Sequence, residues 1–331
     1  MKSFEVGVDI GNYDIKTPHT VTPSGYSVKE CVPFGVDEYI KLGDKYYIPS
    51  EERFPYVKDK TQNERAFVFT LFGIAKEMFR TFDKSSIKGK DKIQKEINDY
   101  GTVNLGVGLP PAHMHMLKEK TVAYYKEMFE KYPTFEYKGF SFNLKLGLIG
   151  VVPQDFAALT CVIGNGEKNI PNTFKEYYAA DIGGATVDIV PIRNNAPLVE
   201  KCVSLELGVL LMYDKIQNYV EENYGISLSN TNIEDVLRNE PTIIDDDIIE
   251  AIKNIAAQWL ENIIEVFSQR GISFQAMPIV FIGGGAKLFR EEILNNKVIK
   301  KSEFIGNANS NALGYQKFIK KLVYKSKNKA S

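Results

Sequence analysis

A short segment that is rich in aspartate and glycine occurs twice in this chain. The first copy, VGVDIGNYDIKT, spans residues 6–17, and the second copy, ADIGGATVDIV, spans residues 180–190. In each copy an apolar run reaches Asp-Ile-Gly, turns within a few small or polar residues, and continues as a second strand-like run. This pattern predicts a β-hairpin in both places. The repeat therefore predicts two similarly folded halves, each with its own sheet, and a cleft between them.

The composition is that of an ordinary globular protein. The 331 residues are 44% apolar and 25% charged, and the net charge of -1 gives no overall attraction to nucleic acid or to an anionic membrane. Cys31, Cys161 and Cys202 are far apart and odd in number, which argues against a disulfide framework and a zinc site. We therefore expect a reducing, cytoplasmic location. No window approaches the ~20 apolar residues of a membrane span, so no integral membrane segment is expected.

Alternating strand and helix patterns predict an α/β fold in which helices flank the sheets. Helical spacing of apolar residues predicts helices over 63–82 and about 113–131, a long helix that starts near three aspartates at 245–247, and a last helix from about 311. The lysine-rich segment 83–96 is expected to be an exposed connection. We place domain I at 1–163, with a small inserted subdomain at about 30–100, domain II at 164–310, and a helix at 311–331 that returns to domain I.

The repeated hairpin has the residues that a phosphate-binding turn needs. Backbone N–H groups must converge on the phosphate oxygens without obstruction by side chains, and Gly11, Gly183 and Gly184 would allow this. An aspartate beside the same phosphates would repel them as a direct ligand. Asp9 and Asp181 are therefore expected to hold a hydrated Mg²⁺ or to orient a water, facing each other across it.

One such turn would more often be a tight turn stabilised by its own aspartate. The presence of two copies at equivalent points of the two halves is what makes the phosphate site the better interpretation. Lys16 and the hydroxyl of Thr186 are expected to contact phosphate oxygens as well.

Other polar clusters are expected to be structural. His113 and His115 are two residues apart on a helix and point about 200° away from each other, so they cannot converge on a metal. The three aspartates at 245–247 suit the start of a helix, where the helix dipole favours negative charge. Thr231 and Glu234 have the spacing of a capping box.

Five segments in order resemble the actin, Hsp70 and sugar-kinase superfamily of ATPases. VDIGNYDIK and ADIGGATVDI resemble its two phosphate loops, VVPQDFAAL and SNALGYQKF its two connecting segments, and IVFIGGGAKLF its adenosine-binding loop. The resemblance implies an actin-like, ribonuclease H-like fold that is duplicated in two domains, with a nucleotide in the cleft between the domains.

The resemblance also implies a role for each matching residue. Asp9 and Asp181 would serve the Mg²⁺ and its waters, and Gln154 would position the hydrolytic water. The other residues expected to bind the nucleotide are glycines and polar residues of the loops: Gly11, Asn12, Lys16, Gly183, Gly184, Thr186, Gly208, Gly283, Gly284 and Gly285.

Within this superfamily, GVDIGNYDIK, GVGLPPA and DIGGATVDIV look most like the ParM and StbA actin-like proteins of bacterial plasmids. That likeness implies a head-to-tail filament driven by ATP or GTP, hydrolysis that destabilises the filament, and segregation of plasmid DNA. The filament would be captured by a DNA-bound adaptor protein, so DNA contact would be indirect.

Two alternatives stay open. One is a small-molecule kinase of the same superfamily, although a glutamine at position 154 suits the orientation of water better than the deprotonation of a sugar hydroxyl. The other is a membrane-associated actin-like scaffold, for which the basic C-terminal segment KFIKKLVYKSKNKAS is the only hint. A solvated helix end explains the same lysines.

Overall fold

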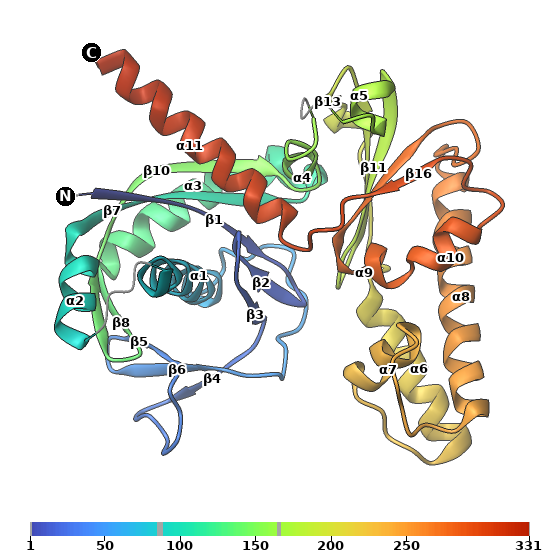
Figure 1. Cartoon of the computed structure of the whole chain (residues 1–331), viewed down its shortest axis with the longest axis horizontal. Coiled ribbons are helices and arrows are strands. Elements are labelled where there is room, and N and C mark those ends of the chain that lie inside the picture. Colours follow the sequence, from blue (N-terminus) through green and yellow to red (C-terminus); the bar gives the residue numbers. More distant parts are fainter. Residues whose placement is uncertain (1, 85–88, 164–166, 331) are drawn as a thin grey trace. The chain divides into compact units, whose positions relative to one another are not determined.

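The structure is a computed structural model that describes residues 2–84, 89–163 and 167–330. It divides into two compact units (Figure 1). Unit 1 consists of Met1–Cys161 together with Asn309–Ser331, and unit 2 is Val162–Ala308. Gly164, where the sequence predicts the start of domain II, lies outside the described residues.

The main sheet of unit 1 has the strand order β10-β7-β1-β2-β3. Its central strand β1 (Lys2–Ile10) pairs in parallel with β7 (Tyr100–Leu109), and β7 pairs in parallel with β10 (Lys145–Pro153). On its other side β1 forms the predicted hairpin with β2 (Asp14–Lys16), which pairs with β3 (Val21–Pro23). The first Asp-Ile-Gly segment therefore lies where the central strand ends.

The sheet of unit 2 repeats this order. Strand β11 (Glu176–Ile182) takes the place of β1, since it is parallel to β15 (Ile279–Ile282), which is parallel to β16 (Ser302–Phe304). On its other side β11 is antiparallel to β12 (Val187–Arg193), which pairs with β13 (Ala196–Pro197) and β14 (Val203–Leu205). The prediction of two similarly folded halves with equivalent hairpins is confirmed.

A third sheet, with the order β4-β6-β5-β8-β9, belongs to unit 1. Its strands are β4 (Tyr26–Lys29), β5 (Ile40–Leu42), β6 (Lys45–Pro49), β8 (Thr134–Tyr137) and β9 (Phe140–Asn143). Two of the strands come from 134–143, far along the chain from the other three. Tyr47 of β6 and Phe142 of β9 are buried in the apolar core of the unit, so this sheet shares that core.

The helices of unit 1 are α1 (Arg65–Lys84), α2 (Lys90–Asp99), α3 (Met114–Lys131), α4 (Phe156–Leu159) and α11 (Ser310–Ala330), with a short 3₁₀ turn at Pro111–His113. In Figure 1, α11 lies on one side of β1, β7 and β10 and α1 lies on the other, and both helices contact β1. The predicted apolar face of α1 is buried: Phe67, Leu71, Ile74, Met78 and Phe82.

The expectation of an exposed connection over 83–96 is wrong for its second half. Residues 90–96 belong to α2, which contacts α1, β7 and β9. The helix forms because Ile97 is buried and Ile93 packs against the same core, an apolar spacing that the surrounding lysines conceal. Residues 85–88 lie outside the described part of the chain.

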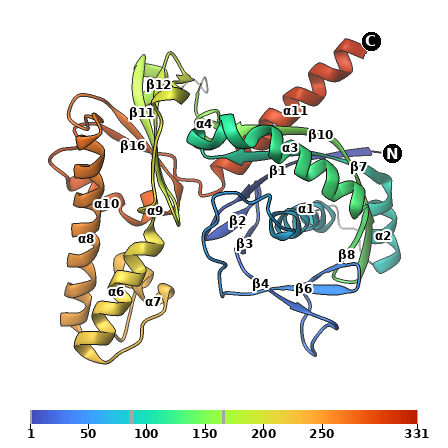
Figure 2. The ribbon, with the colours of Figure 1, turned by 180° about the vertical axis from the view of Figure 1, so that it is seen from behind.

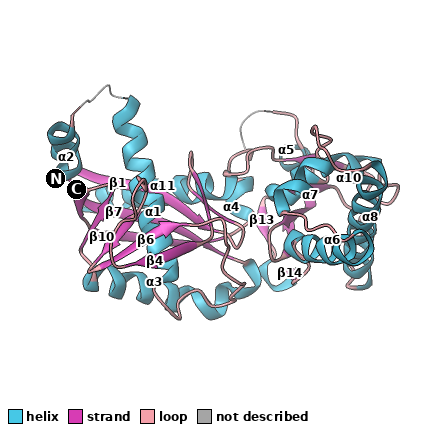
Figure 3. Ribbon diagram, turned by 90° about the horizontal axis from the view of Figure 1, so that it is seen from below, coloured by secondary structure: helices cyan, strands magenta, loops and turns pink. Residues whose placement is uncertain are grey.

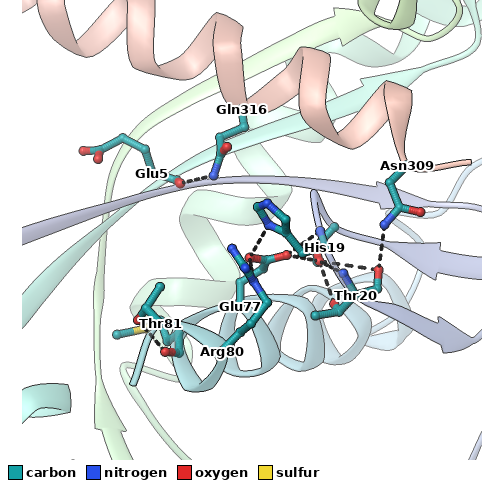
Figure 4. Close-up of polar contacts among 10 residues, drawn as sticks. Glu5, His19, Thr20, Glu77, Arg80, Thr81, Asn309 and Gln316 are labelled. Carbon is teal, nitrogen blue, oxygen red and sulfur yellow. Dashed lines mark hydrogen bonds and ion pairs between the residues drawn. The ribbon is translucent and has the colours of Figure 1, made fainter. Parts of the chain in front are cut away.

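Polar contacts tie α1 and α11 to the first strands (Figure 4). Glu77 of α1 is buried and accepts hydrogen bonds from Thr17 Oγ1 at 2.6 Å and from the His19 N–H at 2.7 Å. Burial alone would raise the pKa of Glu77, but these bonds outweigh it and hold that pKa below its ordinary value. On the other face, Gln316 of α11 donates to the carbonyl of Glu5 at 3.0 Å.

The helices of unit 2 are α5 (Ile170–Thr173), α6 (Val209–Tyr224), α7 (Asn230–Leu237), α8 (Asp246–Gln269), α9 (Gly283–Leu288) and α10 (Arg290–Asn295), with a 3₁₀ turn at Val199–Lys201. Helices α6 and α8 run beside each other in Figure 2 and are in contact. In Figure 3, helices flank the strands in both units. Within the described residues, no helix is long and apolar enough to cross a membrane.

Two predictions about helix starts have different outcomes. The three aspartates at 245–247 do stand at the start of α8, as predicted. The predicted capping box at Thr231 and Glu234 is wrong, because the N-cap of α7 is Ser229, whose side chain accepts from the N–H of Asn232. A serine two residues earlier offers an equivalent oxygen, and the buried Ile233 and Val236 set the helix to start there.

Candidate functional site

Backbone hydrogen bonds hold the second hairpin, at residues 182–187, against the start of α6. The carbonyls of Gly183, Gly184 and Ala185 accept hydrogen bonds from the N–H groups of Val209, Leu210 and Gly208, at 3.1, 2.9 and 3.0 Å. Because a trans peptide holds its C=O and the next N–H in opposite directions, the following N–H groups point away from α6. The three consecutive N–H groups of residues 184–186 are therefore directed to the side of the turn that faces away from α6.

Asp181 is the last but one residue of β11 and lies between this turn and the glycine loop after β15. It is opposite Asp188 in the antiparallel ladder and beside Ile282 in the parallel one. Gly283 follows directly with φ of 91°, and a Cβ there would lie 2.1 Å from Asp181 Oδ1. Only glycine thus allows the loop to pass so close to this carboxylate.

Gly208 has a packing role in the structure. Its N–H donates to Ala185, and a Cβ on it would lie 2.2 Å from the Gly184 carbonyl oxygen. Gly285 packs against Ile182 in the same way, whereas no atom lies within 4 Å of a Cβ placed on Gly284. The structure therefore brings the residues predicted for unit 2 together: Asp181, Gly183, Gly184, Thr186, Gly208, and Gly283, Gly284 and Gly285 at the start of α9 (Gly283–Leu288).

Asp188 is the most perturbed carboxylate of this group, and its side chain is only 6% exposed. Burial raises its pKa to about 6, the charge of Asp181 acts in the same direction, and hydrogen bonds from Ser204 and Thr186 oppose the shift. Thr186 Oγ1 donates to Asp188 Oδ2 at 2.9 Å. The sequence assigned Thr186 to phosphate, whereas its hydroxyl here holds the second aspartate of the hairpin.

This pKa makes a prediction about stability. The pKa of this carboxyl is about 6 in the folded chain and near 4 in the unfolded chain, so the folded chain holds the proton up to a higher pH. Ionisation of the buried carboxyl therefore lowers the stability of the fold as the pH rises above 4, and the full loss is reached above about pH 6. Asp188→Asn should raise the free energy of unfolding of the nucleotide-free protein by about 2 kcal/mol at pH 8, with the gain disappearing below about pH 4. Thermal unfolding across this pH range measures it. The exposed Glu261→Gln on α8 is the control, and an equal gain at every pH would contradict the assignment.

The first hairpin carries the predicted residues of unit 1. Asp9 is 8% exposed, lies opposite Lys16 in the ladder, and accepts a hydrogen bond from Gln154 Nε2 at 3.3 Å. Gln154 follows β10, and its N–H donates to the carbonyl of Leu109 at 2.9 Å, which fixes it at the ends of the parallel strands. Gly11 opens the turn, and its carbonyl accepts from Ser24 Oγ at 2.7 Å.

Lys60 is a residue that the sequence does not reveal. It comes from the loop between β6 and α1, donates a hydrogen bond to the carbonyl of Ile10, and lines a small cavity together with Gly11 and Asn12. Burial lowers its pKa to about 8, although the negative charge of Asp9 acts to raise it. No motif marks this lysine, because it reaches the hairpin only through the fold.

The carboxylates of Asp9 and Asp181 fit a hydrated Mg²⁺ bound with phosphates, since oxygen atoms are the ligands that this ion prefers. Within the described residues, no group of three or more His, Cys, Asp or Glu side chains could hold a metal on its own. Asp9 and Asp181, one in each unit, lie on the strands that lead into the two turns.

Comparisons with known proteins relate the chain to actin homologues. The family model of the archaeal actin homologue MreB-like, C-terminal region, matches residues 179–295. No curated protein matches the chain significantly.

Solved structures match over nearly the full length. A 15-stranded ParM filament from Clostridium botulinum is 19% identical, with 97% of this chain and 100% of that chain covered and a TM-score of 0.68. Ta0583, an archaeal actin homologue in complex with ADP, is 18% identical, with 97% and 100% covered and a TM-score of 0.67. The Alp12 filament structure is 15% identical, with 98% and 100% covered and a TM-score of 0.61. Likeness at these identities shows the fold.

Proposed function

We propose that this chain, which has the two-domain actin-like fold of the ParM proteins and the archaeal actin homologues, is a nucleotide-driven filament protein. It would bind ATP or GTP with Mg²⁺ through its two phosphate loops, polymerise head to tail, and hydrolyse the nucleotide. The resemblance to the ParM and StbA proteins implies that the cargo would be plasmid DNA, held through a DNA-bound adaptor protein. The net charge of -1 gives the chain itself no overall attraction to DNA.

The turn at 183–186 is the observation that carries this proposal. Three N–H groups directed to one side, next to a carboxylate, match the needs of a bound polyphosphate and its Mg²⁺. The bound ion would neutralise phosphate charge, and Asp9 and Asp181 would hold its waters. Two of the similar structures are filaments and a third is a complex with ADP, which supports both assembly and nucleotide binding for this fold.

Gln154 has the position of a water-orienting group in this proposal. Its side-chain amide donates to Asp9 and has a carbonyl oxygen that can accept from a water. An amide has no basic group for removing a proton from an alcohol, so the site suits attack by water better than transfer to a sugar.

Gln154→Ala should therefore lower the rate of nucleotide hydrolysis about 10- to 100-fold. The affinity for nucleotide should change by less than about threefold, because the loops that bind phosphate are left intact. Phosphate release and binding of a fluorescent nucleotide measure the two effects. Gln269→Ala, at the exposed end of α8, is the control, and a full hydrolysis rate in Gln154→Ala would remove Gln154 from the mechanism.

The test of the function as a whole is light scattering of the purified chain with Mg²⁺ and ATP, with GTP, or without nucleotide, followed by electron microscopy of the same samples. We expect a rise in scattering that requires nucleotide and falls as phosphate appears. Scattering that never rises, with phosphate release only after addition of a small acceptor, would identify a kinase instead.

A further inference from the structure

Unit 2 has a groove between α6 and α8 that the proposed nucleotide site does not use. Its volume is about 1060 Å³, and it is lined by residues between 211 and 224 of α6 and between 247 and 262 of α8. Leu211 and Tyr219 of α6 are 50% and 41% exposed on its surface, while Ile255 and Trp259 of α8 are buried along it. The groove therefore offers apolar surface between two helices.

The sides of this groove are acidic. Four exposed carboxylates and a single lysine line it: Asp214, Glu222, Asp247, Glu250 and Lys215. None of the four carboxylates forms an ion pair within the part of the chain that is described. Burial and the charges of Asp247 and Glu250 raise the pKa of Tyr224, which lies at the same end. The groove is thus suited to a cationic ligand.

Trp259 forms part of the wall of the groove. Its side chain is 6% exposed and packs against Phe289, with ring centroids 4.9 Å apart. Its Nε1–H has no hydrogen-bond acceptor among the described residues, although it is buried and belongs to the wall of the groove. The indole ring therefore contributes apolar surface to the wall of the groove.

The same chain carries a segment with the complementary chemistry. Residues 317–328 of α11, which we term the basic tail, are anchored in unit 1 by the buried side chains of Ile319 and Val323. Its outer surface has two exposed aromatic side chains, Phe318 at 38% and Tyr324 at 67%. Five lysines surround them: Lys317, Lys320, Lys321, Lys325 and Lys327.

The dimensions match as well. At 1.5 Å per residue, the basic tail is about 17 Å long, and the stretch of α6 that lines the groove, from Leu211 to Tyr224, is about 20 Å long. The aromatic and basic side chains of the tail would thus meet apolar and acidic side chains along most of the groove.

We propose that the basic tail of one copy docks in the α6–α8 groove of a second copy. The partner is another copy because the complementary surfaces occur on the same chain, and because filaments of this fold are known. The inference rests on the self-association part of the proposed function and not on nucleotide hydrolysis. It assigns a pair of contact surfaces to that association.

The experiment uses Trp259, which is the only tryptophan in the full chain, as the reporter of groove occupancy. Sedimentation and tryptophan emission are measured against protein concentration, with and without Mg²⁺ and nucleotide. The tail-reversed variant is K320E/K321E, and the groove-reversed variant is D247K/E250K. Each should weaken self-association about tenfold or more, and high salt should weaken that of the unaltered chain.

Mixing the two variants is the decisive step. The acidic tail of the first variant fits the basic groove of the second. Association and the change in emission should therefore return when the two variants are mixed, although neither variant shows them by itself. The matched control is E221K/E261K, which reverses two exposed carboxylates on the same helices outside the groove and should associate normally.

Three outcomes would overturn the inference: unchanged association of both variants, no recovery on mixing, or a change in emission that does not depend on concentration. The last would mean that the tail occupies the groove of its own chain. Nucleotide hydrolysis is measured separately in the same samples. Normal hydrolysis with unaffected association would reject the docking surface and leave the proposed function standing. Recovery of association on mixing, in a protein that binds no nucleotide, would support the docking surface and reject the proposed function.

Discussion

Asp181→Ala is expected to abolish nucleotide hydrolysis, with a loss of at least about 100-fold, while the chain keeps its fold. The carboxylate lies near the end of β11, beside the turn that we propose binds phosphate, where it would hold the waters of a metal ion. The rate of phosphate release measures the loss. Circular dichroism and the melting temperature show whether the fold is retained.

The more conservative Asp181→Asn should lose as much activity, because the charge rather than the shape is required. Glu261→Ala, at an exposed position on α8, serves as the control and should hydrolyse nucleotide normally. An active Asp181→Ala protein would show that this hairpin is a structural turn and not a phosphate loop.

Gly208→Ala is expected to lower both the stability of the fold and the affinity for nucleotide. The new Cβ would lie 2.2–2.5 Å from the backbone of Gly184 and Ala185, and backbone atoms cannot move aside as a flexible side chain can. Either α6 or the turn must shift, which we expect to cost about 2–3 kcal/mol of unfolding free energy. The three hydrogen bonds that orient the turn would weaken, so nucleotide affinity should fall about tenfold or more.

Urea unfolding and nucleotide titration test this prediction. Gly306→Ala is a matched control in the same unit, since no atom lies within 4 Å of its added Cβ. A Gly208→Ala protein that unfolds and binds nucleotide as the unaltered chain does would mean that the helix and the turn are not packed as described.

Local patterns predicted the parts of the fold that depend on neighbouring residues. The hairpin at 180–190 could be predicted because apolar alternation and glycines occur within eleven consecutive residues. Helix α1 could be predicted because its apolar residues recur at helical spacing. Where two serine or threonine residues stood close together, as before α7, the pattern did not decide between them, and burial of the helix face did.

The site itself was only partly predictable, because its contacts join distant residues. Gln154 and Asp9 are 145 positions apart and within hydrogen-bonding distance, and only the resemblance to a known superfamily suggested a shared role. Lys60 belongs to no motif, since a lysine in an irregular loop has no spacing to mark it. The packing role of Gly208 likewise depends on a turn that is more than twenty residues away.

The last helix packs on the first strand, and this contact sets the order in which the chain can mature on the ribosome. A Cβ on Gly7 would lie 2.0 Å from the carbonyl oxygen of Ala312, so β1 and α11 are fitted closely to each other. One face of the first-made sheet therefore stays uncovered while all of unit 2 is being synthesised. Unit 1 starts first and is completed last, and a chain released early would expose the apolar face that α11 normally covers.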